Sequence, residues 1–554
     1  MGSSKKSNSN ILVQGSILAM ASIICRIIGI IYRLPMTSII GDIGNNFYGC
    51  AFDIYNVMLI ISSYSLPLAV SKLVSARRAK GEYKMIYQIF KGALLFALVS
   101  GTTVALIVYF GAEFFTDNLL KTPFSIVALQ VLAPALVVVA VLGVLRGFFQ
   151  GLGTMMPSAV SQIIEQIVNA IVSVWAAYVL YGYGTRIGAI KGDKVHYAAA
   201  YGAAGGTLGT NLGSVAALIF VVFIFAIYVR VLKKQMRKDR HKRMDSFGYV
   251  MKILIITIIP VLMSTTIYNI SGIIDQGIFK NIALSQGYNE NDIEVWWGVF
   301  SGKYKLLINV PISIASAMAA SSVPALTASY ASKDFAGVKN QINISMRFVM
   351  VLAFPCAVGL GVLAKPIFTL LFSSQPETID LATTMMWAGA IAVIFYAMST
   401  LSNGLLQGIN RLIVPVINAI IAIVAHVILL VVLMLVFKLN IYAVIWANTF
   451  FAFLMCILNS IAIKKYIGYQ QEIKKTFVIP IVASAIMGLA SYGVYYGLFS
   501  LIKNNTISFI FAFIVAVVVY AVVLLLFKGL TEEELLGFPK GQLIVSIAKK
   551  IHLL

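Results

Sequence analysis

A six-residue phrase, Arg146-Gly-Phe-Phe-Gln-Gly151, has a second version 257 residues later, Asn403-Gly-Leu-Leu-Gln-Gly408. Each copy closes an apolar run. Pro67, in Ser-Leu-Pro-Leu-Ala, and Pro324, in Ser-Val-Pro-Ala-Leu, are separated by the same 257 residues. Two landmarks that repeat at one offset indicate two halves of similar build. Membrane carriers are commonly assembled from such repeats around a central substrate site.

The composition places the chain in a membrane. Of its 554 residues, 60% are hydrophobic and only 11% are charged, and the mean hydropathy is +0.92. No water-soluble domain of this length can bury so much apolar surface. The net charge of +22 would suggest nucleic acid in a soluble protein. Here the Lys and Arg residues sit in short loops between apolar runs, so we expect no nucleic-acid partner.

The sequence gives no sign of a cofactor, a metal site or an enzyme. The four histidines are scattered, and no P-loop is present, which agrees with secondary transport. All the cysteines fall inside predicted spans, so we expect reduced packing residues and no disulfide. They are Cys25, Cys50, Cys356 and Cys456.

About 20 apolar residues are needed for a helix to cross the hydrocarbon, and on that rule we count about fourteen spans. The predicted fold is therefore an all-α polytopic membrane protein. The spans are predicted to begin near Ile11, Asn46, Met85, Phe124, Pro157, Ala198, Tyr249, Trp297, Gln341, Asp380, Ile413, Ile441, Phe477 and Thr506.

The loops alternate in charge, and this alternation predicts the orientation. Basic loops include Arg77-Arg78-Ala-Lys80 and the long stretch from Lys233 to Arg243, whereas acidic loops include Glu290 to Glu294 and Glu377. The positive-inside rule then places both termini in the cytoplasm of a bacterial cell.

The long basic loop is the natural join between two six-helix lobes. Because six is an even number, the second lobe enters the membrane with the orientation of the first, which predicts a parallel, pseudo-symmetric repeat. Two further spans follow, and then an amphipathic tail on the inner surface. The predicted parts are an N-lobe at 1–232, a cytoplasmic linker at 233–248, a C-lobe at 249–465, spans thirteen and fourteen at 466–528, and the tail at 529–554.

A few charged residues fall well inside the predicted spans. A charge at mid-membrane costs ~2.5–3.5 kcal/mol on insertion scales, so each must face a partner, a wet cavity or the bundle interior. The acids are Asp53, Glu165 and Asp275, and the bases are Arg26, Arg33, Lys303 and Lys305.

These charges form one acid–base set in each lobe at similar depth. We predict that Arg33 lies near Asp53, and Asp275 near Lys303 or Lys305. Such pairs either tie neighbouring helices together or serve an ion-coupling site, and the sequence leaves both open.

No acid is evident at the depth of Arg26, which favours a role in a cavity because an unpaired buried cation is costly. We expect Arg26 and Lys305 to face the cleft between the lobes from opposite sides.

Span five carries a polar stripe. Gln162, Glu165, Gln166 and Asn169 recur at spacings of three and four residues, so they share one helix face. The stripe is either a seam of hydrogen bonds between helices or the wet wall of a substrate pathway. The residues alone do not separate these two interpretations.

Several motifs resemble a known family. They are Arg26-Ile-Ile-Gly-Ile-Ile-Tyr-Arg33-Leu-Pro35, Gly41-Asp42, Ser65-Leu-Pro-Leu-Ala-Val-Ser71, and Arg146 through Gln166. The chain resembles the stage V sporulation protein B type of polysaccharide-biosynthesis membrane proteins. These are Gram-positive relatives of the MurJ-type lipid II flippases, within the multidrug/oligosaccharidyl-lipid/polysaccharide exporter superfamily.

The resemblance implies two six-helix lobes around a cationic cavity, two extra helices that form a groove for a lipid tail, and alternating access. It implies a substrate-binding role for Arg26, Arg33 and Lys305, to which we add Lys303. The chain departs from the Gram-negative flippases where Asn46 replaces an acid and Leu59 replaces a cavity arginine. The expected cavity is therefore less charged than theirs.

The predicted function is a flippase that moves a lipid-linked oligosaccharide, foremost the peptidoglycan precursor lipid II, to the outer leaflet. Its partners would be that substrate and membrane lipids, and a monomer would suffice. The alternatives are a flippase for another undecaprenyl-diphosphate-linked polysaccharide, a cation-coupled multidrug exporter, and a scaffold that transports nothing. A drug exporter should carry a cation site built from acids in its first lobe, where this chain offers arginines.

Overall fold

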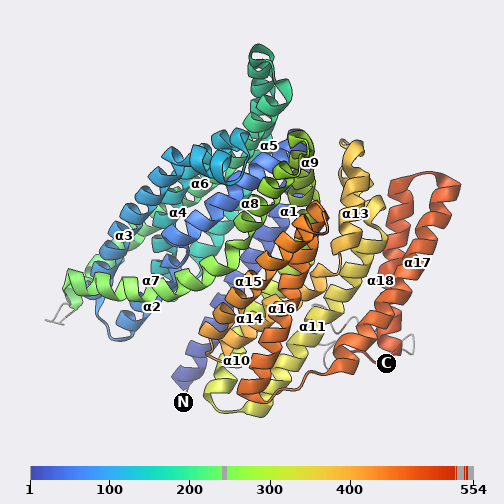
Figure 1. Ribbon diagram of the computed structural model, residues 1–554. Coiled ribbons are helices and arrows are strands. Elements are labelled where there is room, and N and C mark those ends of the chain that lie inside the picture. Colours follow the sequence, from blue (N-terminus) through green and yellow to red (C-terminus); the bar gives the residue numbers. More distant parts are fainter. Residues whose placement is uncertain are drawn as a thin grey trace. The chain divides into compact units, whose positions relative to one another are not determined.

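The computed structural model describes residues 2–239 and 246–530, together with isolated residues of the C-terminal tail. Within these residues the secondary structure is helical throughout, as predicted (Figure 1). The centre of the basic linker and most of the predicted tail helix lie outside the described residues. The chain divides into two compact units, Met1–Gly298 and Val299–Leu554. The predicted lobe boundary at the linker stays a prediction.

The described residues of unit 1 form nine α-helices and three short helical turns. The α-helices are α1 (Gly2–Leu59), α2 (Leu66–Ala79), α3 (Tyr83–Phe110), α4 (Ile126–Gly151), α5 (Met156–Lys191), α6 (Lys194–Lys238), α7 (Phe247–Asn269), α8 (Ser271–Ser285) and α9 (Glu290–Val299). The short turns are the π-helices η1 (Ile60–Tyr64) and η2 (Phe114–Leu119) and the 3₁₀-helix η3 (Pro123–Ser125).

The described residues of unit 2 form nine more α-helices, of which α17 and α18 pair with each other. The α-helices are α10 (Lys305–Ala331), α11 (Phe335–Val362), α12 (Ala364–Leu371), α13 (Ile379–Gly389), α14 (Ala392–Gly408), α15 (Ile413–Leu435), α16 (Ile441–Ile467), α17 (Ile479–Ile502) and α18 (Asn505–Leu526). The short turns are η4 (Phe300–Tyr304), η5 (Pro376–Thr378) and η6 (Lys474–Val478).

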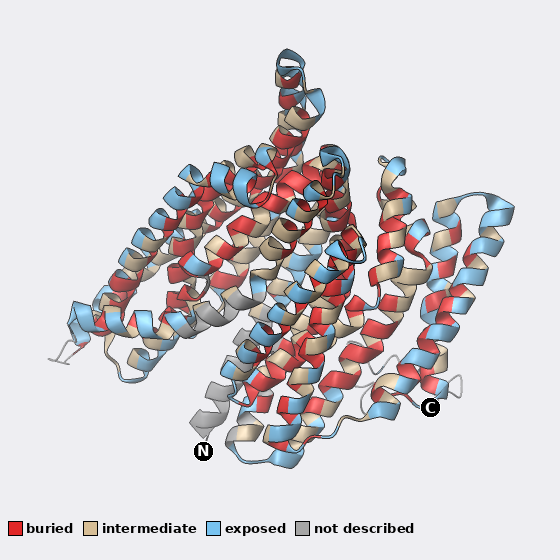
Figure 2. Ribbon diagram, viewed as in Figure 1, coloured by how far each residue is buried: buried red, intermediate tan, exposed pale blue. Residues whose placement is uncertain are grey.

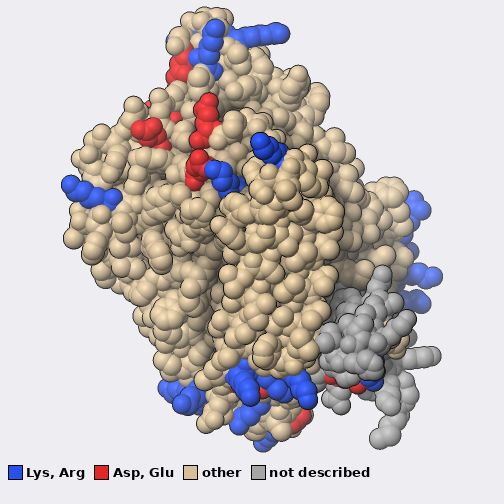
Figure 3. Space-filling model, turned by 90° about the vertical axis from the view of Figure 1, so that its right-hand side faces the viewer, with Lys and Arg blue, Asp and Glu red and all other residues tan. Residues whose placement is uncertain are grey.

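The polytopic membrane fold is confirmed. In the described residues, ten helices are long and apolar enough to cross a bilayer, or eleven if the bent pair α13–α14 counts as one span. The predicted total of about fourteen stays a prediction. On the face that Figure 3 shows, most of the surface is formed by residues other than Lys, Arg, Asp and Glu, and many of the charged residues gather toward the top and the bottom of the view.

Predicted spans one and two are joined without a loop. Both lie within α1, which is interrupted at Gly41, where φ is 72° and ψ is 179°. A residue with a β-carbon rarely adopts that φ, so the glycine allows one long helix to change direction. Span two continues through the π-helix η1 into α2, which begins at Leu66-Pro67.

Glycines bring helices into close contact inside each unit. In unit 1, a β-carbon on Gly147 of α4 would lie 2.6 Å from the Pro67 carbonyl oxygen. In unit 2, a β-carbon on Gly404 of α14 would lie 2.8 Å from Cβ of Ala319 on α10. Both glycines belong to the repeated phrase, and both contacted helices carry one of the repeated prolines. Figure 2 shows buried residues on the helix faces that meet neighbours within a unit.

Candidate functional site

The polar stripe of α5 contains an ion pair with α4. The Arg146 guanidinium Nη2 lies 2.7 Å from Oε2 of Glu165, and the two side chains are only 13% and 23% exposed. Arg146 Nε also donates to the Ser161 hydroxyl at 2.8 Å. Glu165 therefore has a cation partner. Sequence reasoning missed this pairing, because it treated Arg146 as the end of an apolar run.

Asn169, at the other end of the stripe, joins three helices. Its amide donates to the Tyr32 hydroxyl on α1 at 3.3 Å, and its oxygen accepts from Ser173 at 2.8 Å. Ser173 also donates to the Gly206 carbonyl on α6 at 2.8 Å. For this residue the structure supports the interpretation as a seam between helices.

Two glutamines of the stripe have unsatisfied oxygens. The side-chain oxygens of Gln162 and Gln166 are buried, and neither accepts a hydrogen bond from the described residues. Buried amide oxygens usually find a partner, in protein or in ordered water. Gln162, at one end of the stripe, also borders a cavity.

That cavity has a volume of about 200 Å³ and lies inside unit 1. Its polar lining brings two carboxamides, a hydroxyl and a guanidinium together beside the start of α2. Because η1 is a π-helix, a helical form often found at functional sites, the cavity wall is also locally irregular. The lining residues are Leu59, Ser63, Pro67, Val139, Gly143, Arg146, Gln150 and Gln162.

The α1 site residues occupy different surroundings. Arg26 is exposed, whereas Arg33 is half-buried with its guanidinium carbon 4.3 Å from the centroid of the Tyr48 ring. This cation–π contact joins the two segments of α1 on either side of the bend at Gly41. Asp53 is half-buried, and its carboxylate lies beside Gly272 of α8. A β-carbon placed on Gly272 would be 3.5 Å from the Asp53 Oδ2 atom. The predicted pairing of Arg33 with Asp53 stays a prediction.

Lys303 and Lys305 belong to unit 2. Lys303 is fully buried, donates to the Thr378 hydroxyl at 2.5 Å, and lies 5.6 Å from the Phe372 ring centroid. Lys305 is half-buried, with its amine 4.9 Å from the centroid of Phe300. Asp275, on α8 of unit 1, is 1% exposed. The predicted pairing of Asp275 with Lys303 or Lys305 would link a residue of unit 1 with one of unit 2, and it stays a prediction.

Sequence reasoning missed a further buried cation, Lys280 on α8. It is 1% exposed and donates to the Asn46 side-chain oxygen at 2.6 Å and to the Thr122 hydroxyl. Both acceptors are neutral groups of unit 1. Asn46 is the position where the resemblance implies an acid. Lys280 was overlooked because it follows the most apolar part of the seventh predicted span.

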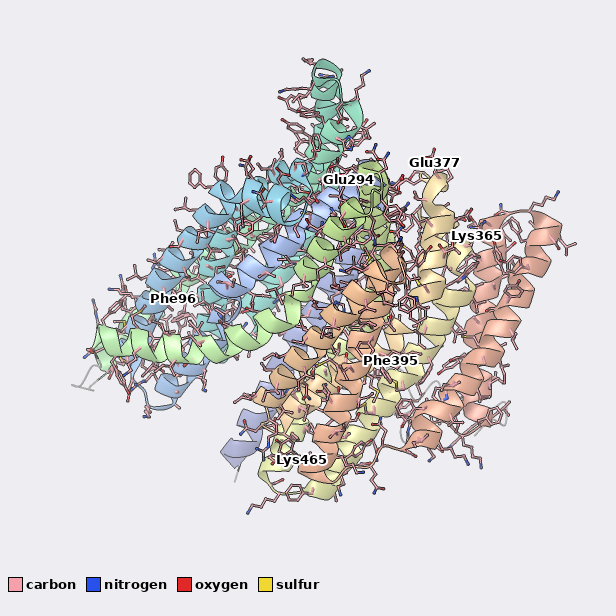
Figure 4. The ribbon with its side chains drawn as sticks, in the orientation of Figure 1. Phe96, Glu294, Lys365, Glu377, Phe395 and Lys465 are labelled. Carbon is pink, nitrogen blue, oxygen red and sulfur yellow. The ribbon has the colours of Figure 1, made fainter. Side chains whose placement is uncertain are left out.

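In the first turn of α6, directly after the turn that joins α5 to α6, His196 is held between two carboxylates. Its Nδ1 lies 2.9 Å from Asp193 Oδ2, and its Nε2 lies 3.1 Å from Oε2 of Glu294, which Figure 4 labels on α9. The His196 ring also stacks on Phe124, with centroids 5.1 Å apart. The cluster fastens α6 to α9. The described residues contain no group of three or more His, Cys, Asp and Glu side chains arranged to hold a metal.

The corresponding place in unit 2 is occupied by a network of neutral side chains. The Asn459 amide donates to Asn403 at 2.8 Å and to Ser402 at 2.9 Å, and its oxygen accepts from Asn418 at 2.9 Å. Asn403 and Asn418 stand 257 residues after Arg146 and Ser161. This neutral network thus connects α14, α15 and α16. Figure 4 shows the charged side chains Lys365 and Lys465 toward opposite ends of the unit-2 helices.

Two protein-family models match parts of the chain. Residues 11–330 match a family model described as polysaccharide biosynthesis protein. Residues 306–432 match a second model, described as MatE.

Two curated proteins of Bacillus subtilis (strain 168) are similar over most of the chain. Lipid II flippase MurJ is 27% identical over 506 residues, which cover 86% of this chain and 87% of that protein. Stage V sporulation protein B is 22% identical over 535 residues, which cover 96% of this chain and 98% of that protein.

Solved structures share the fold. A lipid II flippase MurJ in an inward closed conformation matches with a TM-score of 0.66 at 16% identity, covering 92% of this chain and 98% of that one. An inward-facing multidrug resistance MATE family transporter of the MOP superfamily matches with a TM-score of 0.64 at 13% identity, covering 82% and 98%.

Proposed function

Because the chain belongs to the polysaccharide biosynthesis protein family, we propose that it is a flippase for a lipid-linked oligosaccharide. Lipid II is the substrate we propose, moved from the inner to the outer leaflet of the bacterial plasma membrane by alternating access. Both termini would lie in the cytoplasm. The relatives named as flippases support this assignment.

The observation that carries the proposal is the burial of a cation beside neutral groups. Lys280 is 1% exposed and donates to an amide oxygen and to a hydroxyl. Burying a cation is costly unless its charge is needed. A bundle that retains such a cation is suited to an anionic substrate, and the diphosphate of a lipid-linked sugar is one.

Arg26, Arg33, Lys303 and Lys305 would bind the diphosphate in turn as the protein changes conformation. Arginine suits this task because its guanidinium stays charged and can bind two oxygens at once. Outward movement of each negative charge across an inside-negative membrane gains ~2.3 kcal/mol per 100 mV. Two diphosphate charges could therefore be exported without ATP.

Asp53, Asp275 and Glu165 are the proposed ion-pairing or coupling acids. Glu165 is the best placed, because its partner Arg146 lines a cavity that also reaches Gln162. A proton or another cation that competed with Arg146 for Glu165 would remove one of the links between α4 and α5, while the Arg146–Ser161 hydrogen bond would remain. The polar stripe of α5 would then both hold helices together by hydrogen bonds and take part in coupling ion binding to transport.

The second candidate is a cation-coupled multidrug exporter, which the MatE match and the MATE fold favour. Its cation site would need an available carboxylate. In α5 the Glu165 carboxylate is paired with Arg146, so a coupling cation would have to displace the guanidinium. Drug export by cells that express the chain, measured with a fluorescent cation such as ethidium, would favour this alternative.

The proposal is tested in cells that depend on this protein as their sole flippase. Arg26→Ala should abolish or strongly slow growth, whereas Arg26→Lys should keep part of it because the charge remains. Membrane levels of both variants are measured alongside. Wild-type growth of Arg26→Ala cells at normal protein level would remove Arg26 from the substrate site.

A further inference from the structure

A basic pocket lies at the end of unit 1 where α6 stops and α3 starts. It has a volume of about 380 Å³ and is lined by Lys84, Lys233, Met236 and Arg237. Lys84 is in the first turn of α3, and the other three are in the last turns of α6. The pocket is separate from the α4–α5 cavity and from every residue proposed to bind substrate.

Asp239 sets the geometry of this pocket. Its Oδ2 accepts the backbone N–H of Lys84 at 2.9 Å, so the residue that ends α6 caps the first turn of α3. Asp239 is 8% exposed, and its carboxylate is therefore engaged at the helix start. The hydrogen bond between Lys84 and Asp239 holds the start of α3 beside the end of α6. It thereby keeps Lys84 close to Lys233 and Arg237.

Cations outnumber acids around the pocket. Three of its four described lining residues are cationic, and the carboxylate of Asp239 beside Lys84 offsets only part of that charge. The nearby acid Glu82 is paired with Arg77, with a 2.7 Å contact. A hollow that carries a net positive charge attracts an anion.

We infer that this pocket binds the phosphate headgroup of an anionic phospholipid. Lipid is favoured over a soluble anion because both helices are membrane spans: Ile227 and Val231 of α6 are exposed apolar residues within two turns of Lys233. Met236 adds an apolar surface to the basic lining. Basic pockets between membrane helices are recognised headgroup sites. The inference does not rest on the proposed flippase function.

The test uses the full chain purified in detergent and titrated with phosphatidylglycerol, with bound lipid counted by native mass spectrometry. The variant is Lys233→Gln with Arg237→Gln, which removes two lining charges. The control is Lys234→Gln with Lys238→Gln, which removes the same charge from exposed positions of α6 that do not line the pocket. Each lining base should contribute about fivefold in affinity, so the variant should bind roughly 25-fold more weakly.

Three results bear on the inference. Selective binding of phosphatidylglycerol over phosphatidylcholine, lost in the pocket variant and kept in the control, supports it. Equal weakening of phosphatidylglycerol binding in both variants would mean that general surface charge, and not this pocket, attracts the lipid. That result would overturn the inference. Displacement of phosphatidylglycerol by millimolar inorganic phosphate would overturn the lipid assignment and leave a soluble-anion site.

Discussion

The two copies of the repeated phrase share a backbone plan but differ in charge. α5 and α15 begin at Met156 and Ile413, which are 257 residues apart. In unit 1 the phrase supplies Arg146, which pairs with Glu165 beside a cavity. In unit 2 it supplies Asn403 within a neutral amide network. Close helix contacts occur in both copies, whereas the ion pair occurs in the first. We therefore infer that the shared glycines serve packing, and we propose a role in transport only for the charged residues of the first copy.

The largest expected effect is loss of the charge in the first copy. Arg146→Ala leaves the Glu165 carboxylate partly buried without its cation, which costs ~3–5 kcal/mol when a pair is fully buried. Because Glu165 is 23% exposed, we expect about 2–3 kcal/mol. The free energy of unfolding in mixed micelles, measured by titration with SDS, checks this value.

A double variant sharpens the comparison. Arg146→Asn with Glu165→Ala gives the first copy the residues found 257 positions later, Asn403 and Ala422. It should recover most of the stability that Arg146→Ala loses, because no unpaired charge remains. If the pair serves coupling, the double variant should fold and fail to transport. A folded and fully active double variant would make the pair purely structural.

A smaller difference is expected between the shared glycines. A β-carbon on Gly147 would meet the Pro67 backbone at 2.6 and 2.8 Å, whereas one on Gly404 would meet the Ala319 side chain at 2.8 Å and its backbone at 3.4 Å. Overpacking costs ~1–3 kcal/mol, and backbone atoms move aside less easily than side-chain atoms. Gly147→Ala should therefore lower the unfolding free energy more than Gly404→Ala. The reverse order would mean that α2 moves more easily than α10.

The smallest effect is expected in the neutral network. Asn459→Ala removes the amide that bonds Ser402, Asn403 and Asn418. Hydrogen bonds between membrane helices average ~0.6 kcal/mol, so the loss should be about 1–2 kcal/mol. Transport should continue at near the normal rate, since no charge is altered. A transport defect as severe as that of Arg146→Ala would contradict the assignment of chemistry to the first copy alone.

The fold was largely predictable from hydropathy, because long apolar runs in a membrane must be helical. The absence of a loop between the first two spans was not, since nothing local distinguishes Gly41 as a bend from a glycine inside a straight helix. The stripe on α5 was predicted from its spacing. Its partner was not, because contact between α4 and α5 depends on how the two helices pack.

The candidate site was predicted only in part. The hydropathy profile identified Lys303 as a residue deep inside a predicted span, and Lys303 is fully buried. The same profile did not identify Lys280, which is equally buried. Lys280 is buried by neighbours distant in sequence, Asn46 and Thr122. A hydropathy window contains no information about such neighbours. The pairings predicted for Arg33 and Asp275 depend on the same kind of distant contact and stay predictions.

The central claim is that this chain moves a diphosphate-linked lipid through a path lined by cations. The most direct measurement is translocation of labelled lipid II in proteoliposomes that contain the purified protein and carry an imposed membrane potential. The account predicts transfer faster than in empty vesicles, acceleration when the potential favours movement of negative charge, and loss of transfer in Arg33→Ala. Transfer no faster than in empty vesicles, with correctly folded protein present, would contradict it.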